Sequence, residues 1–249
     1  MVGGLILVEF RVGTTAFATK STTRTLYAAL ASHLNHSTLQ TLEFGLPEDY
    51  EVDEMDVLPE QAEYILAIFV IEEHILATLF CFENLTDITL APPVGFQIDD
   101  AIAWDLARAW PKFKSLCLTA CSHRYLHHPS SMSLLGLRAF AKHCPELASL
   151  TITFDVVIIP PLDSADAVSK ISLRSLDVYT SPIIHSSLVS QLLCPLFSNL
   201  TTIHTFKEWV WDGPGDFDLD KAETAAAHGR LARWKRVKLL PYSKDVDVS

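Results

Sequence analysis

A short pattern of apolar residues recurs along this chain, with apolar positions at i, i+3 and i+5 separated by mostly polar residues. The last two apolar positions are two residues apart, as in a strand that buries one face. Between copies the apolar spacing lengthens to three or four residues, which is the period of an α-helix. The pattern therefore predicts alternating strands and helices. It occurs eight times, at Leu5–Val8–Phe10, Leu39–Leu42–Phe44, Leu85–Ile88–Leu90, Phe113–Leu116–Leu118, Leu147–Leu150–Ile152, Leu173–Leu176–Val178, Leu200–Ile203–Thr205 and Trp234–Val237–Leu239.

Six segments between these copies have helical spacing. Proline directly follows three of the predicted helix ends, as Pro111, Pro145 and Pro195. Because proline lacks the amide hydrogen that continues a helix, we expect a helix to stop at each of them. The predicted helices are Ser21–Asn35, Pro59–Phe82, Asp99–Trp110, Ser133–Cys144, Ser186–Cys194 and Asp220–Trp234.

The distances between copies suggest how these elements stack. Successive copies begin 26 to 46 residues apart, and the shortest steps match a repeat of one strand, one turn and one helix. Each such unit exposes an apolar face that only the next unit can cover. The sequence therefore predicts a single α/β domain over residues 1–249 with about eight strand units. We expect a leucine-rich-repeat solenoid, with a curved parallel sheet on the concave side and helices on the convex side.

Composition narrows the class of protein. Of 249 residues, 49% are hydrophobic, which argues against global disorder. The formal net charge of −11 argues against a general binder of nucleic acid or of anionic membranes. The most apolar stretch, residues 64–82, contains Glu72, Glu73 and His74, which a membrane span would not tolerate at its centre. With no secretion signal at the N-terminus, we expect reduced cysteines and an intracellular protein, cytoplasmic or nuclear.

Several segments resemble a known family. Residues 82–90 (FENLTDITL), 99–118 (DDAIAWDLARAWPKFKSLCL) and 134–154 (LLGLRAFAKHCPELASLTITF) are similar to the irregular leucine-rich-repeat proteins of mushroom-forming fungi, many of which are F-box proteins. In that family the F-box usually precedes the repeats and docks on an adaptor of a ubiquitin ligase, while the repeats receive the substrate. The resemblance implies a substrate receptor, but strand spacing begins by Leu5 and leaves no room for a three-helix F-box before it. We therefore expect an adaptor as partner only if an F-box is supplied elsewhere.

Strand alternation also predicts which side chains line the concave face. From the first strand to the last, these side chains change from acidic through hydroxyl-rich to basic. This pattern suits a protein or peptide partner, with Tyr179 and His204 as anchors. A face that is merely solvated is the alternative. The predicted protein-binding residues are Glu43, Asp87, Thr89, Cys117, Thr119, Ser149, Thr151, Thr153, Asp177, Tyr179, His204, Arg236 and Lys238, with Glu9 preceding them.

Other candidate sites match known chemistry poorly. One metal-like group (Cys117, Cys121, His123, His127 and His128) has no established zinc spacing, and Asp216, Asp218 and Asp220 lack the glycine and the glutamate of a calcium loop. Trp209 and Trp211 are expected to seal the last unit.

No catalytic motif is present, so we predict no catalytic residue, metal or cofactor, and a non-catalytic interaction module. Two alternatives stay open. One is an α/β enzyme with a pocket of His, Asp or Cys at the strand carboxyl ends. The other is a truncated F-box protein without independent activity.

Overall fold

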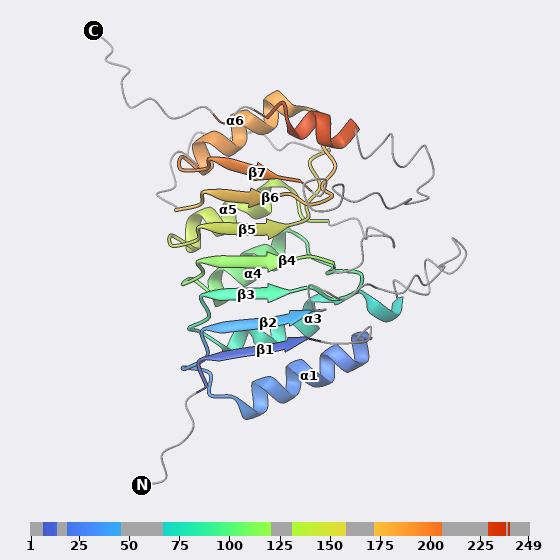
Figure 1. Ribbon diagram of the computed structural model, residues 1–249, viewed down its shortest axis with the longest axis vertical. Coiled ribbons are helices and arrows are strands. Elements are labelled where there is room, and N and C mark those ends of the chain that lie inside the picture. Colours follow the sequence, from blue (N-terminus) through green and yellow to red (C-terminus); the bar gives the residue numbers. More distant parts are fainter. Residues whose placement is uncertain are drawn as a thin grey trace.

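The protein is α/β, built on one parallel sheet (Figure 1). The computed structural model describes residues 7–13, 19–45, 67–120, 131–157, 172–205, 229–237 and 239. In this part of the chain seven strands pair in parallel, and they lie in the sheet in their sequence order. The strands are β1 (Glu9–Gly13), β2 (Thr41–Gly45), β3 (Asp87–Leu90), β4 (Ser115–Leu118), β5 (Ser149–Ile152), β6 (Ser175–Asp177) and β7 (Thr202–His204). The first seven predicted strand segments are confirmed.

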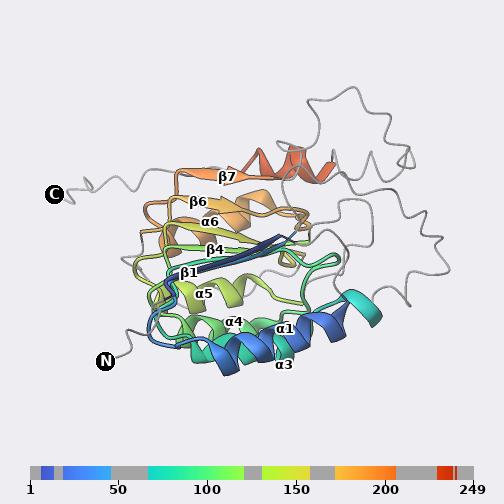
Figure 2. The same ribbon diagram turned by 60° about the horizontal axis from the view of Figure 1, so that its bottom comes forward.

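Helices form a second layer behind the sheet. Figure 2 separates the two layers and shows α1, α3, α4 and α5 together on one side of the strands. The helices and the 3-10 helix η2 are α1 (Lys20–His33), α3 (Glu73–Leu76), η2 (Ala77–Cys81), α4 (Asp100–Ala109), α5 (Leu134–His143) and α6 (Ser186–Leu196), and residues 67–69 and 229–234 are also helical. Among the described residues, no helix is both long and apolar enough to cross a membrane.

The core lies between these layers and follows from the repeated apolar pattern. Pairing in register places Leu42, Ile88, Leu116, Leu150 and Leu176 in one row across the sheet, each at most 1% exposed. Further rows of apolar residues precede and follow this one along the strands. Since each fully buried side chain of this size contributes about 1.5–3 kcal/mol, burial of these rows is the main force that holds neighbouring strands together.

Local signals in the sequence set the helix ends. The side chains of Thr19, Asp99 and Ser133 accept hydrogen bonds from backbone amides in the first turns of α1, α4 and α5. At the other end of α4 and α5, the Trp110 and Cys144 carbonyls accept hydrogen bonds from the amides three residues later. Those amides belong to Phe113 and Leu147, which begin the next strand segments. The same bond recurs where no proline is present, between the Leu200 amide and the Phe197 carbonyl, at 3.0 Å. Helices α4, α5 and α6 are thereby turned directly into the next strand.

Two helix predictions are wrong in detail. Helix α6 does not stop at Cys194 but continues through Pro195 to Leu196. Proline is tolerated there because only the last turn of the helix loses a hydrogen bond. The single helix expected over 59–82 is interrupted in its described part, where Ile71 leaves the helix and pairs with the segment around Phe96. Its amide donates to the Gly95 carbonyl at 3.1 Å and its carbonyl accepts from the Gln97 amide at 2.9 Å, so both groups are unavailable to a helix.

The eighth strand is also absent from the described residues. Around Trp234 the chain remains in helical and turn geometry, because the amides of Lys235, Arg236 and Val237 donate to carbonyls three or four residues earlier. These amides therefore cannot pair with β7. The turn that precedes β3, β4, β5 and β7 still forms here, with the Val237 amide 2.9 Å from the Trp234 carbonyl.

Candidate binding surface

The sheet face opposite the helices has no described helix on it, and we call it the uncovered face. Its outward side chains form two rows, because parallel strands pair in register, about 4.8 Å apart. The first row is Glu9, Thr41, Asp87, Ser115, Ser149, Ser175 and Thr202, and the second is Arg11, Glu43, Thr89, Cys117, Thr151, Asp177 and His204. The alternation of the sequence thus becomes a regular array of polar groups.

Most of the residues predicted from alternation lie on this face. Thr119 and Thr153 follow the carboxyl ends of β4 and β5 and are half-buried. The predicted residues inside the strands are also half-buried, so each offers part of its side chain to solvent while its neighbours hold it in place. These residues are Glu43, Asp87, Thr89, Cys117, Ser149, Thr151, Asp177 and His204.

The predicted set was incomplete. Arg11 lies on the same face beside Glu43, with 3.3 Å between its Nε and the Glu43 carboxylate, and it also pairs with Glu9. The expected acidic end of the face is therefore partly neutralised. Ser115 and Ser175 were missed as well, although the same alternation rule finds them. Only the register shows that they line up with Ser149 in a continuous row of hydroxyl groups.

The centre of the face contains a cysteine with low reactivity. Burial raises the pKa of the Cys117 thiol, and the nearby Asp177 carboxylate raises it further. Its sulfur lies 3.9 Å from the Thr119 hydroxyl, a hydrogen bond that opposes the shift. A thiol held protonated is a poor nucleophile, so Cys117 is a polar contact group in the middle of the row.

Tyr179 is positioned differently from the strand residues. Its φ of 48° is in the left-handed region, and its amide donates to the Asp177 carboxylate at 2.8 Å. The ring extends across the carboxyl edge of the sheet, where its hydroxyl donates to the Ala120 carbonyl at 3.1 Å. Left-handed backbone is costly for a residue other than glycine, and these two hydrogen bonds hold it there. The predicted anchor is thus held in place, but its hydroxyl already donates a hydrogen bond within the chain.

A small hollow lies beneath Tyr179 at the strand carboxyl ends, where an α/β enzyme would have its pocket. Its volume is about 40 Å³, close to that of one or two water molecules, and its described lining contains threonines and apolar residues but no His, Asp or Cys. Cys121, His123, His127 and His128, which follow β4, lie outside the described residues. The prediction of an enzyme pocket stays untested there.

The remaining predicted residues divide into two groups. Arg236 is exposed but lies in a turn and not on a strand, because its amide donates to the Arg233 carbonyl. Lys238, Trp209, Trp211, Asp216, Asp218 and Asp220 lie outside the described residues. Within the described part of the chain, no group of three or more His, Cys, Asp or Glu side chains is arranged to hold a metal ion.

Comparison with known proteins assigns no relative to this arrangement. The chain matches no protein-family model and no curated protein sequence. Its own geometry is that of polar side chains repeated at strand spacing over an uncovered sheet face.

Proposed function

We propose that this protein is a leucine-rich-repeat solenoid that acts as a non-catalytic protein-interaction module. The observation that carries the proposal is the register of the uncovered face, where polar side chains from seven consecutive strands form two rows. Repeat proteins with sequential strands typically bind through such a surface. Strand–helix units that follow one another with the same apolar pattern also favour this fold.

Binding would arise from many moderate contacts on a rigid support. Serine and threonine hydroxyls both donate and accept hydrogen bonds, so the central rows suit a peptide backbone or polar side chains. Glu43, Asp87 and Asp177 add charge on either side of this centre, and a partner with basic groups would complement them. Because neighbouring strands already hold these side chains, little conformational entropy is lost on binding.

The resemblance to fungal F-box proteins suggests a more specific role. If it reflects ancestry, the uncovered face receives the substrate of a ubiquitin ligase, and an adaptor joins through an F-box supplied elsewhere. A soluble role inside the cell is part of this proposal. Neither a nucleic-acid nor a membrane partner is expected of a chain with a net charge of −11.

The test compares three proteins by quantitative affinity capture from the source cells. One is the natural chain. The second carries Thr89→Arg and Ser149→Arg, which place two bulky charges on the uncovered face. The third carries Ala28→Arg and Ala29→Arg on the exposed side of α1, and it controls for added charge.

We expect a set of proteins captured by the natural chain and by the α1 variant but lost with the uncovered-face variant. Ubiquitin-ligase adaptors captured together with that set would support the F-box relationship. The proposal fails if all three proteins capture the same set while both variants remain folded by circular dichroism.

A further inference from the structure

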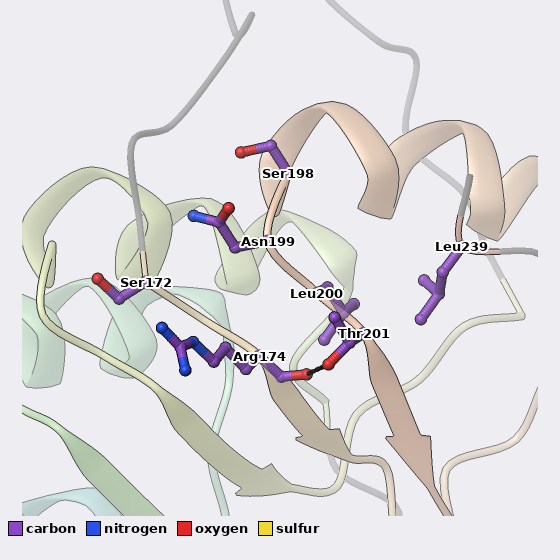
Figure 3. A pocket seen from close by; sticks show the side chains of 7 residues that line it. All are labelled: Ser172, Arg174, Ser198, Asn199, Leu200, Thr201 and Leu239. Atoms are coloured by element: carbon purple, nitrogen blue, oxygen red, sulfur yellow. Dashed lines mark hydrogen bonds between the residues drawn. The ribbon is translucent and has the colours of Figure 1, made fainter. Parts of the chain in front are cut away.

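A hollow of about 710 Å³ opens at the amino edge of the sheet, where β6 and β7 begin (Figure 3). It is far larger than the hollow beneath Tyr179 and lies at the opposite ends of the strands. This volume lies within the range of ligand-binding pockets and greatly exceeds a single small anion. The predicted binding residues do not include any part of its lining.

The two sides of this hollow differ in chemistry. Figure 3 shows Arg174, Ser172 and Asn199 on one side, and Leu200 and Leu239 on the other. The polar side offers a guanidinium, an amide and a hydroxyl. Leu239 is half-buried and gives the other side an apolar surface.

Arg174 is the one charged residue in the described lining of the hollow. Its side chain is exposed and forms no ion pair with a described residue, and no described carboxylate lines the hollow. The backbone beneath it is held in place, because its carbonyl accepts from the Thr201 amide at 3.0 Å and from the Thr201 hydroxyl at 3.1 Å. Among the described residues the guanidinium is thus without an ionic partner, and the backbone that carries it is hydrogen-bonded to β7's entry segment.

We propose that this hollow binds an acidic peptide segment, with a carboxylate on Arg174 and an adjoining aliphatic side chain against Leu239. A planar guanidinium pairs with both oxygens of a carboxylate, and the Ser172 hydroxyl lies in the same lining. The size of the hollow and its apolar side favour a peptide over a free anion. This site is separate from the uncovered face and does not depend on the function proposed for that face.

The experiment titrates the full-length, ¹⁵N-labelled protein with a blocked tetrapeptide that has one aspartate among leucines, and with its asparagine counterpart. Inorganic phosphate is titrated separately. Arg174→Gln removes the charge from the hollow. Lys114→Gln is the matched control, since Lys114 is an exposed cation two strands away on the same edge and does not line the hollow.

We expect saturable amide shifts around Arg174, Asn199 and Thr201 with the aspartate peptide, and binding about tenfold weaker with the asparagine peptide or with Arg174→Gln. Lys114→Gln and the Thr89→Arg/Ser149→Arg protein should bind as the natural chain does. Equal binding by Arg174→Gln, or no saturable shift at these residues, would overturn the proposal. Displacement of the peptide by an equal concentration of phosphate would instead show a simple anion site.

Discussion

The Tyr179 hydroxyl donates a hydrogen bond to the Ala120 carbonyl at 3.1 Å, although these residues follow strands β6 and β4, with β5 between them. The bond ties together the carboxyl ends of three neighbouring strands. It is possible because Tyr179 adopts left-handed backbone geometry, with a φ of 48°, and its amide is held by Asp177. One side chain thus links the ends of β4 and β6 at the carboxyl edge of the sheet.

Removing this hydroxyl should destabilise the protein measurably. We expect Tyr179→Phe to lower the free energy of unfolding by about 0.5–1.5 kcal/mol, the usual net contribution of one hydrogen bond. Tyr27→Phe is the matched control, since the Tyr27 hydroxyl is buried with no hydrogen-bond partner among the described residues and its loss should be neutral or stabilising. Urea unfolding of the two variants measures the difference. Equal effects would mean that the bond to Ala120 is not stabilising.

Two glycines should respond oppositely to alanine. Alanine normally favours a helix by about 1 kcal/mol over glycine. At Gly136 in α5, however, a Cβ would lie 2.5 Å from Met132 Cγ and 2.9 Å from an Asp100 carboxylate oxygen, so Gly136→Ala should be destabilising. At Gly229 the nearest atom is an Arg233 nitrogen at 3.8 Å, so Gly229→Ala should be neutral or stabilising. Thermal melts of both variants check this, and a higher melting temperature for Gly136→Ala would contradict the close packing.

Trp234 attaches the last described helix to the rest of the molecule. Its indole N–H donates to the carbonyl of the buried Ser181 at 2.9 Å, and its ring lies edge-on to Phe154. Trp234→Phe leaves that carbonyl unpaired and should cost about 1–3 kcal/mol.

Trp104→Phe serves as its control. Trp104 is half-buried on α4 and contacts the side chains of Arg108 and Lys142, so this change should cost less than about 1 kcal/mol. Chemical unfolding of both variants gives the comparison. A larger loss at Trp104 would refute the role assigned to the Trp234 hydrogen bond.

Cys144 should make stability depend on alkaline pH. Burial raises the pKa of its thiol from an ordinary 9.0 to about 12. Because the folded state holds the proton more tightly than the unfolded state, this contribution is fully present below pH 9.0 and decreases as the pH rises towards 12. We expect the free energy of unfolding to fall less steeply between about pH 9 and about pH 11 in Cys144→Ala than in the natural chain. Identical slopes would show that this thiol does not contribute.

Local sequence signals predicted the strands and helices well. The apolar alternation identified β1 to β7, and the helices expected from Asp99 and Ser133 do begin there, where the structure shows both side chains bonded to amides of the first turn. Prediction failed where distant contacts compete with local preference. Ile71 pairs with the segment around Phe96 within a stretch of helical spacing. The expected stop at Cys194 was wrong for a local reason, since a proline in the last turn of α6 costs the helix little.

The candidate binding surface could be predicted only in part. Alternation placed Thr89, Cys117 and Thr151 on one face, since side chains of a strand point alternately to its two sides. It could not show that they form one row, or that Arg11 neutralises Glu9 and Glu43, because these facts depend on which strands pair and in what register.

The amino-acid sequence by itself thus determined the order of strands and helices, the residues that face the core and the polar character of the uncovered face. Those properties depend on side-chain periodicity and on contacts between residues close along the chain. Only the tertiary structure decided the two polar rows, the bond from Tyr179 to Ala120 and the hollow around Arg174. Each of these joins segments far apart in sequence, whose approach is set by the packing of the whole core.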